Sequence, residues 1–304
     1  MDDIHDMNIQ EPEIPEFVIE HDGGDSSGNG TKKAPMSRRK RWLYGIALVL
    51  GMLALFAMAF WGYQRWSYYH VIGVPISTSP KANIEKLRQP AKEEKAEVVL
   101  TQDSILGVAL NFYAIHGLRA NIEFTEPDTT DRSVFLYCRS ADYTREGKYI
   151  GSLVAEGEEL GNDRTRLGYM AMADGQMVIG VSRSDKVKDY VMERGGSFFR
   201  QFILVSSGVI PPRFYLHGKV ERRAIGRIGS TLYYIATRHK ETLWDFADAL
   251  REYGFIDAIY ITGGNNHHFY RTIDGTPHDI GSVEVDTLRK KSDMVPWLVF
   301  RQKP

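Results

Sequence analysis

The pattern of apolar and polar positions divides the chain into four stretches. Residues 1–37 are polar and acidic, residues 42–63 are apolar and uncharged, residues 64–97 are polar with three prolines, and residues 98–304 alternate short apolar runs with turn residues. As a helix, the second stretch would be about 33 Å long, which matches a bilayer core of roughly 30 Å. We therefore predict a single transmembrane helix over residues 42–63.

The charges around that stretch predict its orientation. Six lysines and arginines precede it between residues 32 and 41, whereas only Arg65 and Lys81 follow it closely. Cytoplasmic flanks of membrane spans carry the excess of lysine and arginine. We therefore expect a single-pass membrane protein with a cytoplasmic N-terminus and an extracytoplasmic C-terminal domain, in a bacterial inner membrane facing the periplasm.

The two stretches beside the helix are predicted to be flexible. Residues 1–37 hold nine acidic side chains against two lysines, with a run rich in Gly, Ser and Asn over residues 23–30. Such a segment buries too little apolar surface to offset its ordering entropy, so we expect a disordered cytoplasmic tail. Nothing in it identifies a partner. Residues 64–97 are expected to form a tether.

The apolar runs of residues 98–304 are four to nine residues long and rich in Val, Ile, Tyr and Phe, which is typical of strands. Asp174-Gly175 lies between two of them and predicts a tight hairpin, because a type I′ turn needs positive φ angles. The runs predicted as strands are Ile105–Tyr113, Val134–Cys138, Gly168–Ala173, Gln176–Val181, Phe198–Val205, Thr231–Thr237, Ala258–Ile261 and Trp297–Phe300.

Two helices are predicted among these strands, over Asp185–Arg194 and Leu243–Tyr253. Thr242 is placed to cap the second helix and Gly254 to end it. Since that helix lies between two strands, the segment predicts a βαβ crossover with parallel, neighbouring strands. The expected fold class is mixed α/β, with a multi-stranded mixed sheet, a few helices and one βαβ crossover, preceded by the transmembrane helix.

Composition and motifs exclude several kinds of binding and catalytic site. The formal net charge of −1 excludes a broadly basic nucleic-acid-binding surface, so we expect no nucleic-acid partner. The single cysteine, Cys138, excludes an intramolecular disulfide and a zinc site built on several thiolates. No Walker loop, nucleophile elbow or HExxH pair is present. We therefore expect no cofactor and no metal.

The best candidate for a binding loop follows the strand predicted at Ala258–Ile261. It reads Thr262-Gly263-Gly264-Asn265-Asn266-His267-His268. A Gly-Gly pair at the C-terminal end of a strand allows backbone N–H groups to turn toward a ligand, and ligands favour this edge of α/β sheets. The alternative is a tight connection to the next strand.

The chain resembles the phosphodiester glycosidase domain family over most of residues 100–304. The resemblance rests on Arg222-Arg223-Ala224-Ile225-Gly226, the helix Thr242–Gly254 and the segment Asp257–Gly264. Weaker matches are Met172–Gly175, the stretch from Gln201 to Gly208, and Asn111-Phe112-Tyr113. The resemblance implies hydrolysis of sugar-1-phosphodiester bonds, so a phosphorylated glycan is the expected ligand.

The resemblance also implies the site residues. Arg222, Gly263, Gly264 and Asn111 stand at family positions, whereas Thr262 replaces the family's aspartate and both of its serines are missing. We expect Thr262, Arg222 and His267 at the catalytic centre, with substrate bound by Asn111, Gly263, Gly264, Asn265 and Asn266. Because a neutral threonine cannot supply a carboxylate's charge to a cationic sugar, two hypotheses stand: a hydrolase with an altered site, or a non-catalytic relative that binds a glycan or a partner.

Overall fold

A computed structural model describes residues 38–69, 78–90, 94–144, 147–212, 214, 216–264, 267–281 and 295–302. The predicted tail over residues 1–37 and the candidate site residues Asn265 and Asn266 lie outside this description. The chain divides into two compact units, Met1–Ala57 and Met58–Pro304.

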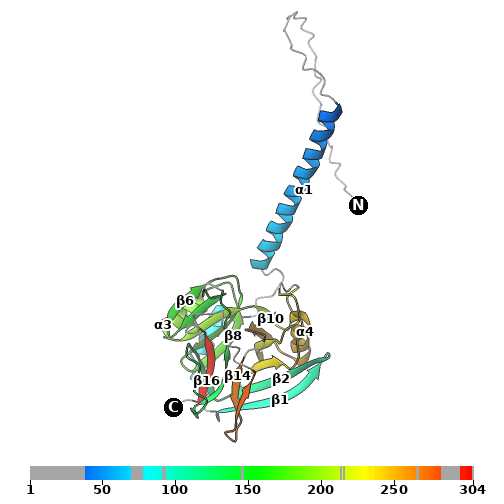
Figure 1. The fold of residues 1–304 in the computed structure, drawn as a ribbon. Helices are drawn as coiled ribbons and strands as arrows, with labels where there is room; N and C mark the ends of the chain where they lie inside the picture. The colour runs from blue at the N-terminus through cyan, green and yellow to red at the C-terminus, as the bar shows by residue number, and fades with distance from the viewer. Residues whose placement is uncertain are drawn as a thin grey trace, which may run out of the picture. The chain divides into compact units, whose positions relative to one another are not determined.

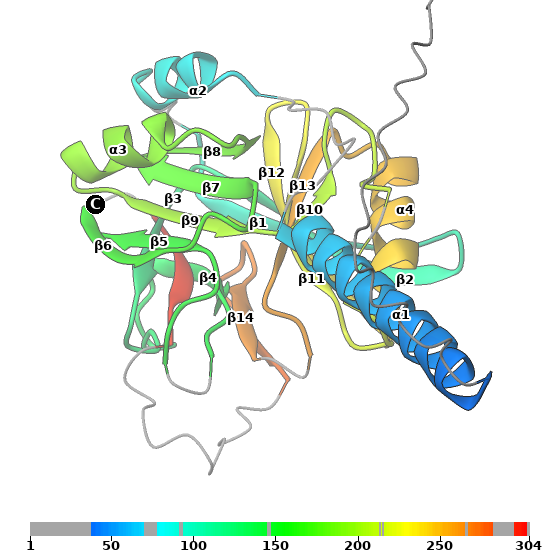
Figure 2. The same ribbon diagram turned by 90° about the horizontal axis from the view of Figure 1, so that it is seen from above.

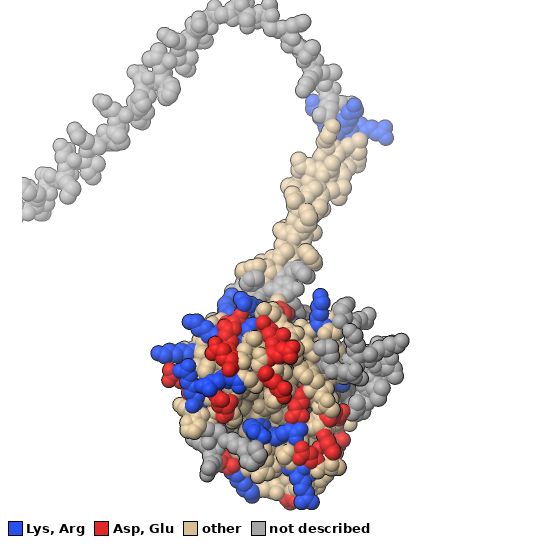
Figure 3. Space-filling model, turned by 90° about the vertical axis from the view of Figure 1, so that its left-hand side faces the viewer, with Lys and Arg blue, Asp and Glu red and all other residues tan. Residues whose placement is uncertain are grey.

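Helix α1 spans Arg38–Tyr69 and is longer at both ends than the predicted membrane span. Its part Arg38–Gln64 is long and apolar enough to cross a membrane, judged by length and composition. The basic residues gather at its N-terminal end and are followed by an uncharged, fully exposed surface (Figure 3). Apolar side chains on all sides of a helix are typical of a membrane span.

The strands that follow form three sheets, and every pairing between the described strands is antiparallel (Figure 1). The first sheet has the order β1 (Glu97–Ile105), β2 (Val108–His116), β12 (Thr231–Thr237), β11 (Arg223–Ile228), β13 (Asp257–Ile261) and β10 (Ile203–Val205). The second has the order β15 (Pro277–Ile280), β14 (His268–Arg271), β4 (Val134–Arg139), β16 (Trp297–Gln302) and β3 (Leu118–Glu123). The third has the order β6 (Glu158–Asn162), β5 (Ser152–Ala155), β9 (Ser197–Gln201), β7 (Gly168–Ala173) and β8 (Gln176–Val181).

Three helices cover the outer sides of this domain. Helices α2 (Pro80–Leu87) and α3 (Lys186–Glu193) lie on the third sheet, and α4 (Leu243–Tyr253) lies on the first (Figure 2). As predicted, Thr242 caps α4 by accepting a hydrogen bond from the Asp245 N–H at 3.0 Å, and Gly254 ends it with φ of 107°.

Helix α2 lies within the stretch expected to be a tether. Its Asn83 is buried and donates to the Tyr169 hydroxyl at 2.7 Å, and Thr78 accepts from the Val181 N–H at 2.9 Å. Residues 78–90 are therefore attached to the third sheet.

The largest hydrophobic cluster lies where the three sheets meet. Each sheet contributes buried side chains to it, among them Tyr113 and Ile225 from the first, Leu136 and Phe300 from the second, and Met170 and Phe199 from the third. A second cluster fills the space between the first sheet and α4, where Phe112, Tyr260 and Phe246 are buried. The predicted mixed α/β class is confirmed.

Three predicted details differ from the structure. The run Phe198–Val205 is not one strand, because it is divided between β9 in the third sheet and β10 in the first. The βαβ unit is present, but β12 and β13 are not neighbours, because β11 lies between them and pairs antiparallel with both. The two strands still run in the same direction. The run Ile105–Tyr113 is not one strand, since Leu106 and Gly107, with φ of 51° and 83°, turn the chain between β1 and β2. The apolar Leu106 hides this turn in a hydropathy pattern.

Candidate functional site

The candidate loop begins where β13 ends, on the edge of the first sheet. Thr262, Gly263 and Gly264 follow Ile261, whose strand partner is Arg223. The Thr262 hydroxyl is buried and has no hydrogen-bond partner among the described residues. A neutral oxygen therefore occupies the position at which the resemblance implies a carboxylate.

Tyr260 connects two of the predicted site residues. Its hydroxyl interacts with the backbone of Gly263 and with the guanidinium of Arg222, whose central carbon lies 5.9 Å from the tyrosine ring centre. Burial, followed by the negative charge of Asp142, raises the pKa of Tyr260 above its ordinary value, so the hydroxyl keeps its proton at neutral pH.

Arg222 lies beside the loop but is held by the protein. It is 3% exposed, its Nε donates to the Glu241 carbonyl at 3.0 Å, and one terminal nitrogen donates to the Gly218 carbonyl at 2.8 Å. Because side chains alternate along β11, Arg222 and Ala224 share the side of the sheet that packs against α4. Arg222 therefore links the segment that precedes β11 to the segment that precedes α4. A phosphate could bind the Arg222 guanidinium only by competing with these two backbone carbonyls.

Arg223, which the sequence analysis did not select, points to the opposite side of the sheet. It is buried, donates to the Gly264 carbonyl and contacts Glu221 at 3.3 Å. The Gly264 N–H in turn donates to the Glu221 carbonyl at 2.8 Å. Both backbone groups of Gly264 are therefore used within the protein, as in a structural turn.

Gly263 is expected to tolerate no side chain. A Cβ atom there would lie 2.2 Å from the Tyr260 hydroxyl and 2.8 Å from the Glu221 carbonyl oxygen. Gly263→Ala should therefore lower the free energy of unfolding by about 1–3 kcal/mol, since the backbone must move to accommodate it. Urea unfolding of the two proteins measures the difference. Gly264→Ala is the control, because it meets positive-φ strain at 83° but no atom within 4 Å, and its cost should be near 1 kcal/mol.

A carboxylate missed by the sequence analysis lies beside Tyr260. Asp142 is half-buried, and its Oδ2 accepts a hydrogen bond from the Gln201 side chain at 3.3 Å. Its charge acts on the Tyr260 hydroxyl, which in turn contacts Gly263. Gln201 carried a signal through the family resemblance, whereas Asp142 stands in a segment without a motif. The structure thus places the negative charge of Asp142 near the end of β13, where the chain has the neutral Thr262 in place of a carboxylate.

Asn111 is not beside the loop. It lies on β2, which is separated from β13 by β12 and β11, so about 14 Å of sheet lies between the two strands. Its side chain accepts a hydrogen bond from Gln102 on β1 at 2.9 Å. The structure therefore does not bring Asn111 together with Thr262 and Gly263.

His267 lies on the outer side of the second sheet, among acidic and aromatic side chains. Its Nδ1 lies 3.0 Å from a Glu126 oxygen without the alignment of a hydrogen bond, and its Nε2 contacts Asp279. The rings of Tyr137 and Trp297 meet it edge-on, and the imidazole is 4% exposed. Two carboxylates and two aromatic rings therefore surround the imidazole of His267, and we call these residues the His267 cluster.

His268 points the other way, into the core between the first and second sheets. Its Nε2 lies 3.1 Å from the Tyr113 hydroxyl, and it is 1% exposed. Burial, and then the positive charges of Arg223 and His267, lower its pKa to about 3. His268 is therefore neutral in the folded protein.

This burial predicts an acid-sensitive step in stability. An unfolded histidine titrates near 6.5, whereas the folded one titrates at about 3. Between these values the unfolded state binds one more proton, so stability falls as the pH falls, by about 1.4 kcal/mol per unit. Urea unfolding at pH 7, 6 and 5 should show this slope in the natural protein, and His268→Gln should lack it. Equal slopes in both proteins would contradict the assignment to His268.

Among the described residues, no group of three or more His, Cys, Asp or Glu side chains could hold a metal ion. Near the end of β13 the structure places the carboxylate of Asp142, the protonated hydroxyl of Tyr260 and the amide of Gln201. Of the predicted site residues, Gly263 and Arg222 contact Tyr260, and Thr262 and Gly264 adjoin Gly263 in the chain, whereas Asn111 lies on β2 and His267 beside Tyr137 and Trp297. That they form one binding site stays a prediction.

Comparisons with known proteins add distant likenesses. No family model and no curated protein matches the sequence. The catalytic domain of zebrafish N-acetylglucosamine-1-phosphodiester alpha-N-acetylglucosaminidase, auto-inhibited by its pro-peptide, is 12% identical with a TM-score of 0.49, over 72% of this chain and 86% of that one. A hypothetical protein from Synechocystis is 10% identical with a TM-score of 0.49, over 69% of this chain and 64% of that one. Likenesses at this level establish no shared activity.

Proposed function

We propose that the chain is a membrane-anchored phosphodiester glycosidase-like protein that hydrolyses sugar-1-phosphodiester bonds in surface or periplasmic glycans. The observation that carries the proposal is Asp142, a half-buried carboxylate that accepts a hydrogen bond from Gln201 at 3.3 Å and whose charge acts on Tyr260 at the end of β13. The motif resemblance around Arg222 and Gly263 supplies the substrate class.

Hydrolysis of a sugar-1-phosphodiester needs a negative charge near the end of β13. In the proposed reaction the bond between the anomeric carbon and the phosphate oxygen breaks, the phosphate leaves with the electron pair, and water adds to the sugar. The sugar becomes cationic on the way, and a carboxylate stabilises or attacks it. Asp142 would take this part, and the neutral Tyr260 hydroxyl would donate to a phosphate oxygen.

Binding without turnover is the second candidate. It is favoured by Arg222, whose guanidinium is occupied by the carbonyls of Glu241 and Gly218, and by the neutral Thr262. In that case the same edge would hold a phosphorylated glycan, and no bond would break.

A substrate panel separates the two candidates. The full chain in detergent is incubated with sugar-1-phosphate methyl diesters of several sugars, and the release of free sugar and methyl phosphate is followed. Hydrolysis that depends on the sugar supports the enzyme. Binding in calorimetry without any release of sugar supports the binding protein, and the absence of both contradicts the proposed site.

The membrane part of the proposal rests on α1. We place residues 1–37 in the cytoplasm and the domain from Thr78 onward outside it, because the cations gather at the N-terminal end of the helix. A phosphatase reporter that is active only outside the cytoplasm, fused after Pro304, should be active. Activity of a reporter that works only in the cytoplasm would reverse the orientation.

A further inference from the structure

An apolar hollow of about 430 Å³ lies beside the start of α4. Phe214, Leu216 and Trp244 line it, with Pro212 at its side, and we call these four residues the Trp244 surface. The Trp244 side chain is 46% exposed, and the Phe214 ring meets it edge-on with the ring centres 6.0 Å apart. Exposed aromatic side chains in a contiguous apolar patch mark an interaction surface.

Other apolar residues of the domain are exposed near the two ends of α4. Val220 pairs with Glu241 immediately before the helix, and Val209 lies next to Ile256 immediately after it. The side chains of Val220, Val209 and Ile256 are each more than one-third exposed. Apolar side chains are thus exposed at both ends of α4.

Of the three carboxylates on α4, the two nearer the Trp244 surface are engaged by neighbouring side chains, and Glu252 is exposed at the opposite end of the helix. Asp248 on its outer side is paired with Arg251, and the Asp245 carboxylate accepts a hydrogen bond from Thr242. Lys240, just before the helix, is exposed and has the sign that attracts lipid phosphates.

The anchor limits how far this surface can lie from the membrane. Gln64, the last residue of the apolar segment Arg38–Gln64, lines the same hollow as Trp244. The nine steps from Tyr69 to Thr78 span at most about 30 Å. A domain of this size is roughly 40 Å across, so the connection keeps it within about one domain diameter of the bilayer.

We propose that the Trp244 surface contacts the bilayer interface and holds the domain against the membrane in which α1 is anchored. Tryptophan favours the headgroup level, because its ring is apolar while its N–H donates to polar groups. The inference rests on the membrane anchor of the proposed function. The surface of a partner protein is the competing occupant.

The test places a fluorescent label next to the surface. The only native cysteine, Cys138, is buried and burial raises its thiol pKa, so an introduced cysteine is labelled selectively. His217→Cys lies at the rim of the hollow and keeps Trp244. Ile273→Cys, 57% exposed in the β14–β15 turn, is the control. Each full chain is labelled with nitrobenzoxadiazole and reconstituted into phosphatidylcholine nanodiscs with and without spin-labelled phosphatidylcholine.

The spin-labelled lipid should quench the label at residue 217 and not the label at residue 273, and adding Trp244→Ala to His217→Cys should remove the quenching. Equal accessibility of both labels to aqueous iodide, with no quenching by lipid, would overturn the inference. If the label at residue 217 is still quenched after Trp244→Ala, the Trp244 surface does not hold the domain against the bilayer, and the inference is wrong. A chain that does not co-purify with nanodiscs would instead refute the membrane anchor itself, so the two failures are distinguishable.

Discussion

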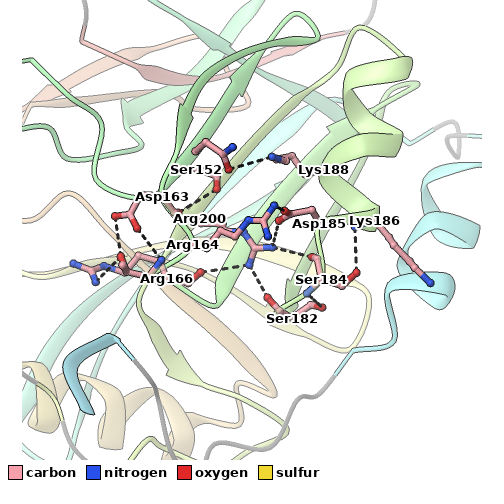
Figure 4. Close-up of polar contacts among 12 residues, drawn as sticks. Ser152, Asp163, Arg164, Arg166, Ser182, Ser184, Asp185, Lys186, Lys188 and Arg200 are labelled. Atoms are coloured by element: carbon pink, nitrogen blue, oxygen red, sulfur yellow. Dashed lines mark hydrogen bonds and ion pairs between the residues drawn. The ribbon is translucent and has the colours of Figure 1, made fainter. Parts of the chain in front are cut away.

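Arg200→Ala is expected to destabilise the domain by about 3–5 kcal/mol, which is a large part of the roughly 5–15 kcal/mol that holds a domain folded. Arg200 on β9 is 1% exposed and donates to the carbonyls of Ser182 at 2.6 Å and Ser184 at 2.8 Å (Figure 4). It also contacts Asp185, the N-cap residue of α3, at 3.2 Å.

Removing this guanidinium leaves buried carbonyls unsatisfied and a partly buried carboxylate without its inner partner, which is why the cost is high. Burial lowers the pKa of Arg200, but the Asp185 charge opposes this effect. The measurement is urea unfolding of the full chain in detergent, followed by circular dichroism.

Arg164→Ala is the matched control. Arg164 contacts the other oxygen of the same Asp185, but its side chain is 66% exposed, so its loss should cost about 0–1 kcal/mol. If the two substitutions cost the same, Arg200 is not the residue that holds the turn before α3 to the third sheet.

Asp142→Asn is expected to reduce hydrolysis of a sugar-1-phosphodiester by about 10²–10⁴-fold, the range for losing a group that transfers protons or stabilises charge in the transition state. The amide keeps the shape and can still bond to Gln201, but it removes the charge beside Tyr260. The fold should survive, because Asp142 is only half-buried.

The measurement is kcat/KM on the best diester of the panel, with the unfolding free energy as a check on folding. Asp174→Asn is the control, since Asp174 lies in the β7–β8 hairpin, and asparagine tolerates its φ of 53°. Turnover that is unchanged in Asp142→Asn would remove Asp142 from the reaction. The carboxylates of Glu126 and Asp279 beside His267 would then be the next candidates.

Local sequence determined the elements whose signals lie within a few residues. Thr242, the apolar stripe of α4 and Gly254 define that helix, because capping and periodicity act over one or two turns. Asp174-Gly175 defines the hairpin for the same reason, with φ angles of 53° and 75°. The apolar length of α1 is likewise a property of the sequence alone.

Strand order was decided only by the tertiary structure. The segment around α4 predicts two parallel strands but cannot show that β11 lies between them, because β11 precedes both in the chain and its pairing depends on long-range contacts. The turn at Leu106-Gly107 was missed because its apolar residue continues the hydrophobic pattern.

For the candidate site as well, the sequence indicated some features and only the tertiary structure decided the others. The motif resemblance placed Thr262, Gly263 and Arg222 at one edge, and the structure brings them around Tyr260. Sequence could not show that Arg222 faces α4 while Arg223 faces the core, since a shift of one residue in register exchanges the two sides of a strand. Nor could it find Asp142, which is far from β13 in the chain and reaches Tyr260 only through the packing of the sheets, because side chains that meet across sheets leave no local pattern.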